Sequence, residues 1–387
     1  MTLPRLRIAY LCDHSPLDRN MYSGGNARIH DALQEHVGDV TILSQGWSAA
    51  EPLRRLIMAA PDRVTMRLRW RAHLALRRVI ASGIERELRA NPADMLFGAY
   101  AFHTLAGLRV PPGMITAFTS DATPTVYRLS EIGQAYRRVF PLGRLLDDWV
   151  ERQERAAFRS VDLLLWPSRW LWHETQTRYD LDPDRCHLVP WGANIPMPPP
   201  PAPRAVSPGA PIELLVIGRD WFAKGGPVAF DTMQQLRAAG LDARLTVIGC
   251  VPPEFHRSAQ VTVHPQLNKS VPEELATFEA ALARAHFLVQ PSVESYGFAF
   301  CEASAHGLPS LCLEVGGVPV WDGQNGHALP LGSDAAAFAR LIRSYIDDPA
   351  RYVALCRSAR DLYEARLNWD AWGRRVAELV AERRRAV

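Results

Sequence analysis

Short apolar runs alternate with longer amphipathic segments along most of the chain. An apolar run at 7–12 is followed by a polar loop, by a helical pattern at about 26–36 and by a second apolar run at 39–43. A strand, a helix and a strand in this order predict one βαβ unit of a parallel sheet. Later apolar runs predict further strands of the first half at 94–99, 114–118 and 162–167.

The same alternation starts again after residue 212 and predicts a second doubly wound α/β domain. Its strands are expected at 213–218, 244–249, 261–264, 287–290 and 310–313, with helices at 227–239 and 272–285. Between the two halves, residues 196–211 contain eight prolines and no periodic apolar pattern, which predicts an extended linker. The expected organisation is a domain at 1–195, the linker, a domain at 212–365 and a final helix at 366–387.

A long helix or a pair of helices is expected at 54–88. The middle of this segment lacks acidic residues and carries arginines at 63, 67, 69, 71, 77 and 78. Such a pattern is typical of a solvated helix face beside a buried stripe. The alternative is a basic surface that meets anionic lipid headgroups, with Trp70 and Leu74 as interfacial contacts.

Composition indicates a globular protein of the cytoplasm. Hydrophobic residues make up 48% of the 387 residues, and 44 basic residues nearly balance 41 acidic ones, so the total charge does not favour a nucleic-acid partner. The six cysteines are scattered without a Cys-x-x-Cys pair, which argues against a cysteine zinc site and a disulfide framework. The first apolar run is too short for a signal peptide, and no apolar run is long enough to span a membrane.

The stretch 291–309 carries the most informative chemistry. Glu294 and Glu302 bracket Gly297, and the amides of Phe298 and Ala299 are expected to open a helix. Free amides at a helix start suit an anion, whereas carboxylates accept hydrogen bonds from hydroxyl groups. Anion and polyol together describe a nucleotide sugar. The alternative is that the two glutamates are surface charges at the ends of a short helix.

Two further groups of residues follow strand ends. Arg219 and Lys224 leave the first strand of the second half beside glycines, where two cations suit a diphosphate, although isolated they would be solvated surface charges. Gly24 and Gly25 precede the first helix and form either a simple turn or a close main-chain approach to phosphate. The dinucleotide fingerprint Gly-x-Gly-x-x-Gly is absent, which disfavours a dehydrogenase.

One metal motif of other enzymes has a formal match in the chain. Asp182 and Asp184 form an Asp-x-Asp pair, but they flank Pro183 in a segment between a helix and a strand. Asp and Pro are ordinary turn residues there, so we interpret this pair as a turn.

The Glu-x7-Glu spacing around Tyr-Gly-Phe, followed by Glu-Ala-Ser-Ala-His-Gly-Leu-Pro, resembles the donor-site signature of retaining glycosyltransferases of family 4, the glycosyl transferases group 1. The Gly-Arg-x4-Lys-Gly arrangement at 218–225 resembles the pyrophosphate pair of that family. The resemblance covers nearly the whole chain, most strongly at 213–326 and most weakly at 50–160. It implies a GT-B fold, in which two Rossmann-like domains face each other across a cleft and the last helix packs back toward the first domain.

The resemblance also implies the activity, which is transfer of a sugar from a nucleotide diphosphate sugar to a glycan, lipid-linked or small-molecule acceptor with retention of configuration. It assigns the donor diphosphate to Arg219, Lys224, Gly24 and Gly25 and implies neither a metal nor a cofactor. It places the donor sugar on Glu294, which is also a catalytic candidate. The ribose falls to Glu302, beside the helix start formed by Gly297, Phe298 and Ala299.

The acceptor side departs from the family pattern. The position at which the family often has a His is Thr119, so Asp121 becomes the acceptor-side catalytic candidate, and His103 lies in the neighbouring loop. This departure keeps a second hypothesis open, a non-catalytic subunit that binds nucleotide sugar or assists assembly. Expected partners are a nucleotide sugar and an acceptor, with peripheral contact to an anionic membrane as a hypothesis and no nucleic acid.

Overall fold

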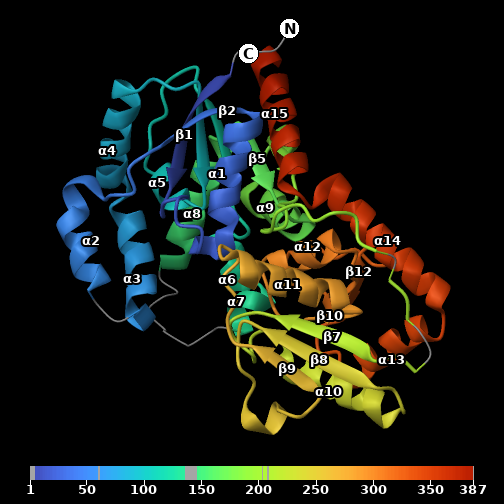
Figure 1. Cartoon of the computed structure of the whole chain (residues 1–387). Helices are drawn as coiled ribbons and strands as arrows, with labels where there is room; N and C mark the ends of the chain where they lie inside the picture. Colours follow the sequence, from blue (N-terminus) through green and yellow to red (C-terminus); the bar gives the residue numbers. More distant parts are fainter. Residues whose placement is uncertain (1–4, 60–61, 136–145, 203, 207–208, 387) are drawn as a thin grey trace. The chain divides into compact units, whose positions relative to one another are not determined.

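The computed structural model describes residues 5–59, 62–135, 146–202, 204–206 and 209–386 (Figure 1). The chain divides into two compact units. Unit 1 comprises residues 1–130, 136–190 and 372–387, and unit 2 comprises residues 131–135 and 191–371. Among the described helices, none is both long and apolar enough to cross a membrane.

Unit 1 is built on a six-stranded parallel sheet with the strand order β2-β1-β3-β4-β5-β6. The strands are β1 (Leu6–Cys12), β2 (Gly38–Ile42), β3 (Met95–Ala99), β4 (Ile115–Thr119), β5 (Leu163–Trp166) and β6 (Cys186–Leu188). Chain order changes direction between β1 and β3, because β2 lies on one side of β1 while β3 to β6 follow on the other. The predicted parallel α/β architecture is confirmed for this unit.

Helices complete unit 1. They are α1 (Gly25–His36), α2 (Glu51–Met58), α3 (Asp62–Ala75), α4 (Arg77–Ala90), α5 (Phe102–Leu105), α6 (Pro124–Leu129), α8 (Asp147–Arg159) and α9 (Arg169–Tyr179), with short 3-10 turns at Met21–Gly24, Ser48–Ala50 and Pro183–Arg185. Ser168 caps α9 as its side chain accepts a hydrogen bond from the Leu171 amide at 3.2 Å. The core between helices and sheet contains Leu11, Leu96 and Phe118.

The arginine-rich segment differs from its prediction in two respects. It forms three helices, α2, α3 and α4, where one long helix or a pair was expected. Leu74 is completely buried in the core of unit 1 and Trp70 packs against that core, so Leu74 is wrong as an interfacial contact. Among the described side chains of α3, Trp70 and Leu74 serve core packing, as expected for a buried stripe. Arg63 and Arg67 lie outside the described side chains.

Unit 2 repeats the architecture with a parallel sheet of strand order β12-β11-β10-β7-β8-β9 (Figure 1). Its strands are β7 (Ile212–Ile217), β8 (Ala243–Ile248), β9 (Val261–His264), β10 (Phe287–Val289), β11 (Ser310–Leu313) and β12 (Gly326–Leu329). Its helices are α7 (Glu131–Ala135), α10 (Gly226–Ala238), α11 (Pro272–Arg284), α12 (Phe298–Ala305), α13 (Ala335–Ile346) and α14 (Pro349–Arg366), with a 3-10 turn at Glu254–His256. The strand β12 was not predicted; its four residues, Gly-His-Ala-Leu, carry a weak apolar signal.

The proline-rich segment is extended and is held to unit 2 by two arginines. Arg360 on α14 donates hydrogen bonds to the carbonyl oxygens of Pro198 (3.0 Å) and Ala305. Arg204 donates to the carbonyl oxygens of Leu282 (2.6 Å) and His306 (3.0 Å). Pro198 belongs to the proline-rich segment, whereas Leu282, Ala305 and His306 lie at the C-terminal ends of α11 and α12, where carbonyl oxygens have no partner within the helix.

The last helix, α15 (Trp369–Ala386), begins in unit 2 and contributes its larger part to unit 1. Within unit 1, its Trp372 is buried with its ring 6.0 Å from that of Phe97. Near its end, Arg383 pairs with Asp162 at 2.6 Å. The basic end of the chain is therefore partly engaged inside unit 1.

Candidate functional site

The donor-site candidates of unit 2 meet where its sheet changes direction. Strands β7 and β10 are neighbours, yet β8 and β9 follow on one side while β11 and β12 follow on the other. In such parallel sheets, ligands bind at the carboxyl ends of the strands at this switch point. The loop after β7 carries Arg219 and Lys224, and the loop after β10 carries Glu294 and Gly297. The two loops thus bring residues that are about 70 positions apart in the sequence to one edge of the unit 2 sheet.

Lys224 and Glu294 form an ion pair across this switch point. Lys224 Nζ lies 2.9 Å from Glu294 Oε2, and both side chains are largely buried. The lysine stem packs over Gly218, where a Cβ would lie 2.3 Å from Lys224 Cγ. Gly218 is therefore required at the strand end so that the lysine can turn back toward the glutamate.

The Glu294 carboxylate is fixed by further polar contacts. Gln290 Nε2 donates to Glu294 Oε1 at 2.8 Å, and Ser292 Oγ donates to the same oxygen. Burial by itself raises the pKa of this carboxyl, but the Lys224 charge and the hydrogen bonds from Ser292, Lys224 and Gln290 outweigh burial and lower the pKa below its usual range. Glu294 is consequently ionised at neutral pH and can accept hydrogen bonds from sugar hydroxyls. Gln290 and Ser292 were not predicted as site residues.

Gly297 provides the turn into α12. Its φ of +95° is a left-handed conformation that other residues adopt at a cost, and a Cβ there would lie 2.7 Å from the Phe300 ring and 3.1 Å from Glu294 Oε2. The helix begins at Phe298, so the first amides of α12, including that of Ala299, have no carbonyl partner within the helix. This local geometry is what the sequence predicted for an anion-binding helix start.

Glu302 is a buried carboxylate with a lysine partner. It is only 2% exposed on α12, and Lys269 Nζ donates a hydrogen bond to Glu302 Oε1. The Lys269 ammonium also lies 4.5 Å above the centre of the Phe278 ring. The surface-charge alternative for this glutamate is thereby wrong. Lys269 was not predicted as a partner, because it lies 33 residues away in a loop with only a loose family match.

Arg219 is exposed at the end of β7. Its neighbour Gly218 donates an amide hydrogen bond to the carbonyl oxygen of Ile248 at 2.8 Å, which anchors the strand end. The Arg219 side chain therefore starts from an anchored strand end, in the loop that also carries Lys224. Its predicted contact with a diphosphate stays a prediction.

The candidates of unit 1 lie in its strand-end loops. Gly24 has a φ of +89° and caps α1, which Gly25 begins, and Tyr22 and Ser23 before them also have positive φ values. The Tyr22 ring stacks on that of Tyr100, with 4.0 Å between ring centroids. This strained turn fits either interpretation of the two glycines, so their contact with phosphate stays a prediction.

Asp121 and Thr119 follow the end of β4 in very different environments. Thr119 is completely buried and its hydroxyl donates to the carbonyl oxygen of Leu165 at 2.7 Å, so it has a structural role. Asp121 is half-buried, and its negative charge adds to the effect of burial in raising the pKa of Tyr100. Asp121 thus influences the electrostatics of the strand-end loops, while its catalytic role stays a prediction.

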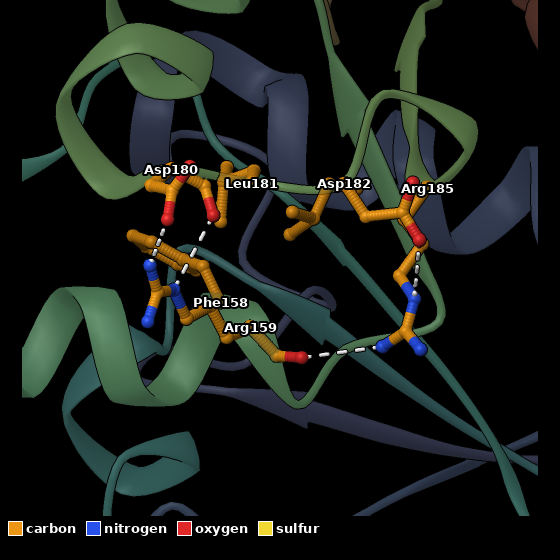
Figure 2. A pocket seen from close by; sticks show the side chains of 7 residues that line it. Phe158, Arg159, Asp180, Leu181, Asp182 and Arg185 are labelled. Carbon is orange, nitrogen blue, oxygen red and sulfur yellow. Dashed lines mark hydrogen bonds and ion pairs between the residues drawn. The ribbon is translucent and has the colours of Figure 1, made fainter.

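The Asp-x-Asp pair forms a turn in the structure. Asp182 caps a 3-10 turn by accepting the amide hydrogen of Asp184 at 3.0 Å. It borders a cavity of about 350 Å³ lined by Phe158, Arg159, Leu164, Asp180, Leu181, Asp182 and Arg185 (Figure 2). The charged groups of this cavity pair with one another, Arg159 with Asp180 at 2.5 Å and Arg185 with Asp182 at 3.5 Å. The turn interpretation of the motif is confirmed.

Comparison with solved structures defines the class of fold. Sucrose-phosphate synthase from Thermosynechococcus elongatus is similar over 99% of this chain and 100% of its own, with a TM-score of 0.69 and 20% identity. HepE from Anabaena, solved in complex with UDP-glucose, is similar over 98% of this chain and 100% of its own, with a TM-score of 0.59 and 13% identity. The two doubly wound units and these neighbours confirm the predicted GT-B fold.

Sequence comparison finds a family match within unit 2. Residues 211–348 match the family described as glycosyl transferases group 1. A D-inositol 3-phosphate glycosyltransferase of Streptomyces avermitilis is 40% identical over 110 residues, which are 28% of this chain and 23% of that protein. A GDP-mannose-dependent alpha-(1-6)-phosphatidylinositol monomannoside mannosyltransferase of Mycolicibacterium smegmatis is 29% identical over 178 residues, 42% of this chain and 46% of that protein. The alignments span less than half of these two curated relatives.

The chain therefore contains a glycosyl transferases group 1 domain at 211–348, in agreement with the resemblance of the motifs at 218–225 and 291–309. The matched segment contains every donor-site candidate of unit 2.

Proposed function

We propose that the protein transfers a sugar from a nucleotide diphosphate sugar to an acceptor with retention of the anomeric configuration. The observation that carries the proposal is the Lys224–Glu294 ion pair beside the α12 start, at the switch point of a glycosyl transferases group 1 domain. Support for the donor class comes from a structural neighbour solved with UDP-glucose. The relatives' names mention inositol 3-phosphate and phosphatidylinositol mannoside, so a polyol, phosphorylated or lipid-linked acceptor is proposed.

Positive potential for the departing diphosphate comes from Lys224, Arg219 and the free amides of α12. A diphosphate at this helix start competes with Glu294 for Lys224, because the ammonium lies 2.9 Å from that carboxylate. Developing negative charge on the leaving group is then stabilised by groups already in place, without a metal ion at the diphosphate. Glu294, which is ionised, accepts hydrogen bonds from the donor sugar, and Glu302 accepts those of the ribose.

Retention requires that the new bond forms on the face from which the diphosphate leaves. We propose that the acceptor hydroxyl oxygen bonds to the anomeric carbon while the bond from that carbon to the phosphate oxygen breaks. The proton of the acceptor hydroxyl passes to the departing diphosphate, so atoms and charge balance without a covalent enzyme intermediate. Asp121 is proposed as an acceptor-side residue.

Paired variants of the two glutamates test the proposal. Glu302→Gln is expected to weaken nucleotide binding, since ribose contacts act in the ground and transition states alike, whereas Glu294→Gln is expected mainly to lower kcat. Calorimetric titration with nucleoside diphosphates and a turnover assay with a panel of nucleotide sugars measure the two effects. Glu273→Gln, at an exposed position of α11, is the control. Equal losses of affinity in both site variants would contradict the assignment.

The two cations are tested by a comparison of ligands. Arg219→Ala and Lys224→Ala are each expected to weaken binding of the nucleoside diphosphate by roughly 1.5–3 kcal/mol, the usual contribution of a charge-assisted contact. Binding of the bare nucleoside should change much less. The same loss for both ligands would remove these residues from the phosphate site. Loss of donor binding in a chelator would contradict the metal-free diphosphate site.

A non-catalytic binding subunit is the second candidate function, and Thr119 favours it. The family often has a His at this position, whereas the Thr119 hydroxyl is committed to the carbonyl oxygen of Leu165. Incubation with nucleotide sugars and no acceptor distinguishes the two candidates, because a transferase slowly hydrolyses its bound donor while a binder leaves it intact.

Peripheral attachment to an anionic membrane is proposed for α2. Leu53 and Leu56 on this helix are 41% and 71% exposed, and Arg55 beside them is exposed as well. Apolar and basic side chains on one short helix suit the lipid interface, and each arginine near the headgroups contributes about 1 kcal/mol. Leu56→Asn should reduce sedimentation with anionic vesicles at low salt, while Leu331→Asn, at a 54% exposed position of unit 2, should not. No sedimentation of the unaltered protein at low salt would refute the attachment.

A further inference from the structure

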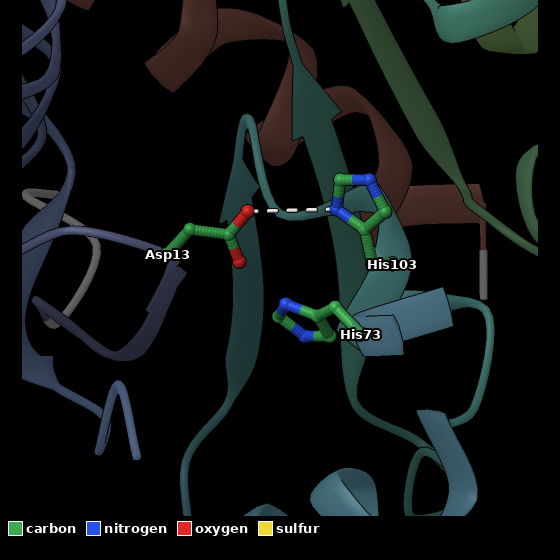
Figure 3. Close-up of side chains that lie close together, drawn as sticks. All are labelled: Asp13, His73 and His103. Carbon is green, nitrogen blue, oxygen red and sulfur yellow. Dashed lines mark ion pairs between the residues drawn. The ribbon is translucent and has the colours of Figure 1, made fainter. Parts of the chain in front are cut away.

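Asp13, His73 and His103 converge at the switch point of the unit 1 sheet (Figure 3). Asp13 directly follows β1, and His103 lies on α5, just after β3. The strands β1 and β3 are neighbours, and chain order changes direction between them. His73 reaches the same place from α3. One ligand-type atom from each side chain lies within 4.8 Å of the other two. The cluster thus occupies the edge where ligands bind in parallel sheets, and it shares no residue with the donor site of unit 2.

His103 has two buried ring nitrogens that the fold does not use. The residue is 7% exposed, and among the described residues neither Nδ1 nor Nε2 has a hydrogen-bond partner. The nearest charged atom is Asp13 Oδ2, at 3.5 Å from His103 Nδ1, while Asp13 Oδ1 is buried without a hydrogen bond. Buried polar atoms normally have partners, so these orphaned atoms indicate a ligand that satisfies them.

His73 is oriented by a contact that is typical of metal-binding histidines. Its Nε2 lies 2.8 Å from Thr104 Oγ1, and the residue is 5% exposed. A hydrogen bond from one ring nitrogen to a neighbouring oxygen fixes the tautomer and leaves the lone pair of the other nitrogen for a metal. Thr104 follows His103 in the chain, so one short helix supplies both a ligand and the group that orients a second ligand.

The surroundings of the cluster are aromatic. The rings of Trp47 and Trp70 lie 5.2 Å from those of His73 and His103, respectively.

We propose that Asp13, His73 and His103 bind a divalent first-row transition-metal ion, for which zinc is the probe. Two imidazoles and one carboxylate are a donor set that such ions prefer, and three protein ligands leave at least one position open for water or a substrate oxygen. Zinc holds these atoms at about 2.0–2.2 Å, so ligand atoms now up to 4.8 Å apart must converge to about 3.3 Å.

The positive charge of Arg69 opposes the ion. Its Nη1 lies 3.3 Å from His14 Nε2, next to Asp13 in the chain, and its charge acts on the Asp13 carboxylate. Coulomb repulsion between a guanidinium and a divalent cation lowers affinity. Arg69→Met should therefore tighten zinc binding. A purely structural role of the arginine predicts the opposite, weaker zinc binding in this variant.

The test is zinc titration of the full-length protein without an affinity tag, after removal of metals with a chelator. We expect one equivalent of zinc to bind by calorimetry, and cobalt to give the visible absorption of a low-coordinate nitrogen and oxygen site. Asp13→Asn and His103→Gln should each abolish stoichiometric binding, and Thr104→Val should weaken it about 10–100-fold through loss of the orienting hydrogen bond. His187→Gln, at a half-buried histidine of unit 1 outside the cluster, is the matched control.

Circular dichroism verifies that each variant is folded. If His103→Gln fails to fold, Asp13→Asn still tests the site, because asparagine keeps the shape of the aspartate side chain. The proposal is overturned if neither zinc nor cobalt binds stoichiometrically. It is also overturned if Asp13→Asn and Thr104→Val both leave the zinc affinity unchanged. Nucleoside diphosphate binding by the metal-free protein is measured in parallel, so failure of the metal site and failure of the donor site are distinguished.

Discussion

Glu154 offers a quantitative test of the unit 1 interior. This residue lies on α8 with no exposed surface, and its Oε1 accepts a hydrogen bond from the Thr125 amide at 3.0 Å. Its Oε2 is buried and has no hydrogen bond among the described residues. Burial raises the pKa of this carboxyl from 4.5 to about 7, although the Thr125 bonds act in the opposite direction. We expect Glu154→Gln to stabilise the protein above neutral pH.

The sign and size follow from proton linkage. The folded state holds the Glu154 proton more tightly than the unfolded state, so stability is lost as pH rises from 4.5 to about 7. Above that range the difference between the two pKa values corresponds to about 3 kcal/mol. Glutamine carries no charge and keeps the acceptor for Thr125, but its amide donors remain without a partner at the site of Oε2, which costs about 1–2 kcal/mol. The net gain is about 1–2 kcal/mol at about pH 8.

Differential scanning calorimetry of both proteins between about pH 5 and pH 8 measures this effect. The variant should unfold a few degrees above the unaltered protein at the high pH. This difference should disappear or reverse near the low pH, where the cost of the unpaired amide donors exceeds the linkage effect. Glu151→Gln is the control, because Glu151 is on the same helix with a more exposed carboxylate that pairs with Arg155 at 3.6 Å. A variant that is no more stable at high pH, or a gain that does not change with pH, would refute the account.

Three further substitutions test contacts of unit 2. Lys269→Met should destabilise the fold by about 3 kcal/mol or more and weaken nucleotide binding, because it leaves the Glu302 carboxylate buried without its partner. Urea unfolding that matches the unaltered protein would contradict a stabilising role of the Lys269–Glu302 pair. Gly297→Ala should lower nucleotide affinity, since its Cβ would lie 2.7 Å from the Phe300 ring, and unchanged calorimetric affinity would show that this turn tolerates a side chain. Arg360→Met should increase proteolysis within 196–206, as the bond to Pro198 is lost, and an unchanged cleavage pattern would argue against this anchoring role.

Local patterns in the sequence determined the architecture and the donor-site motifs. Apolar runs of strand length alternating with helical periods predicted the two parallel sheets, because such periodicity reports which face of each element is buried. The spacing of Glu294 and Glu302 around Gly297 predicted the helix start that the structure has. These features depend on neighbours within a few residues, so they can be predicted from the sequence without knowledge of the fold. The strand β12 was not predicted, because its four residues carry only a weak apolar signal.

Only the tertiary structure decided which distant side chains meet. Lys269 reaches Glu302 from 33 positions away, and Asp13 joins His103 because β1 and β3 are adjacent in the sheet. No spacing rule connects such residues, since their proximity depends on strand order and on the packing of helices over the sheet. Leu74 was a lipid contact only in the alternative interpretation of its helix, and it is buried. Periodicity identifies an apolar face but does not say whether the core or another surface covers it.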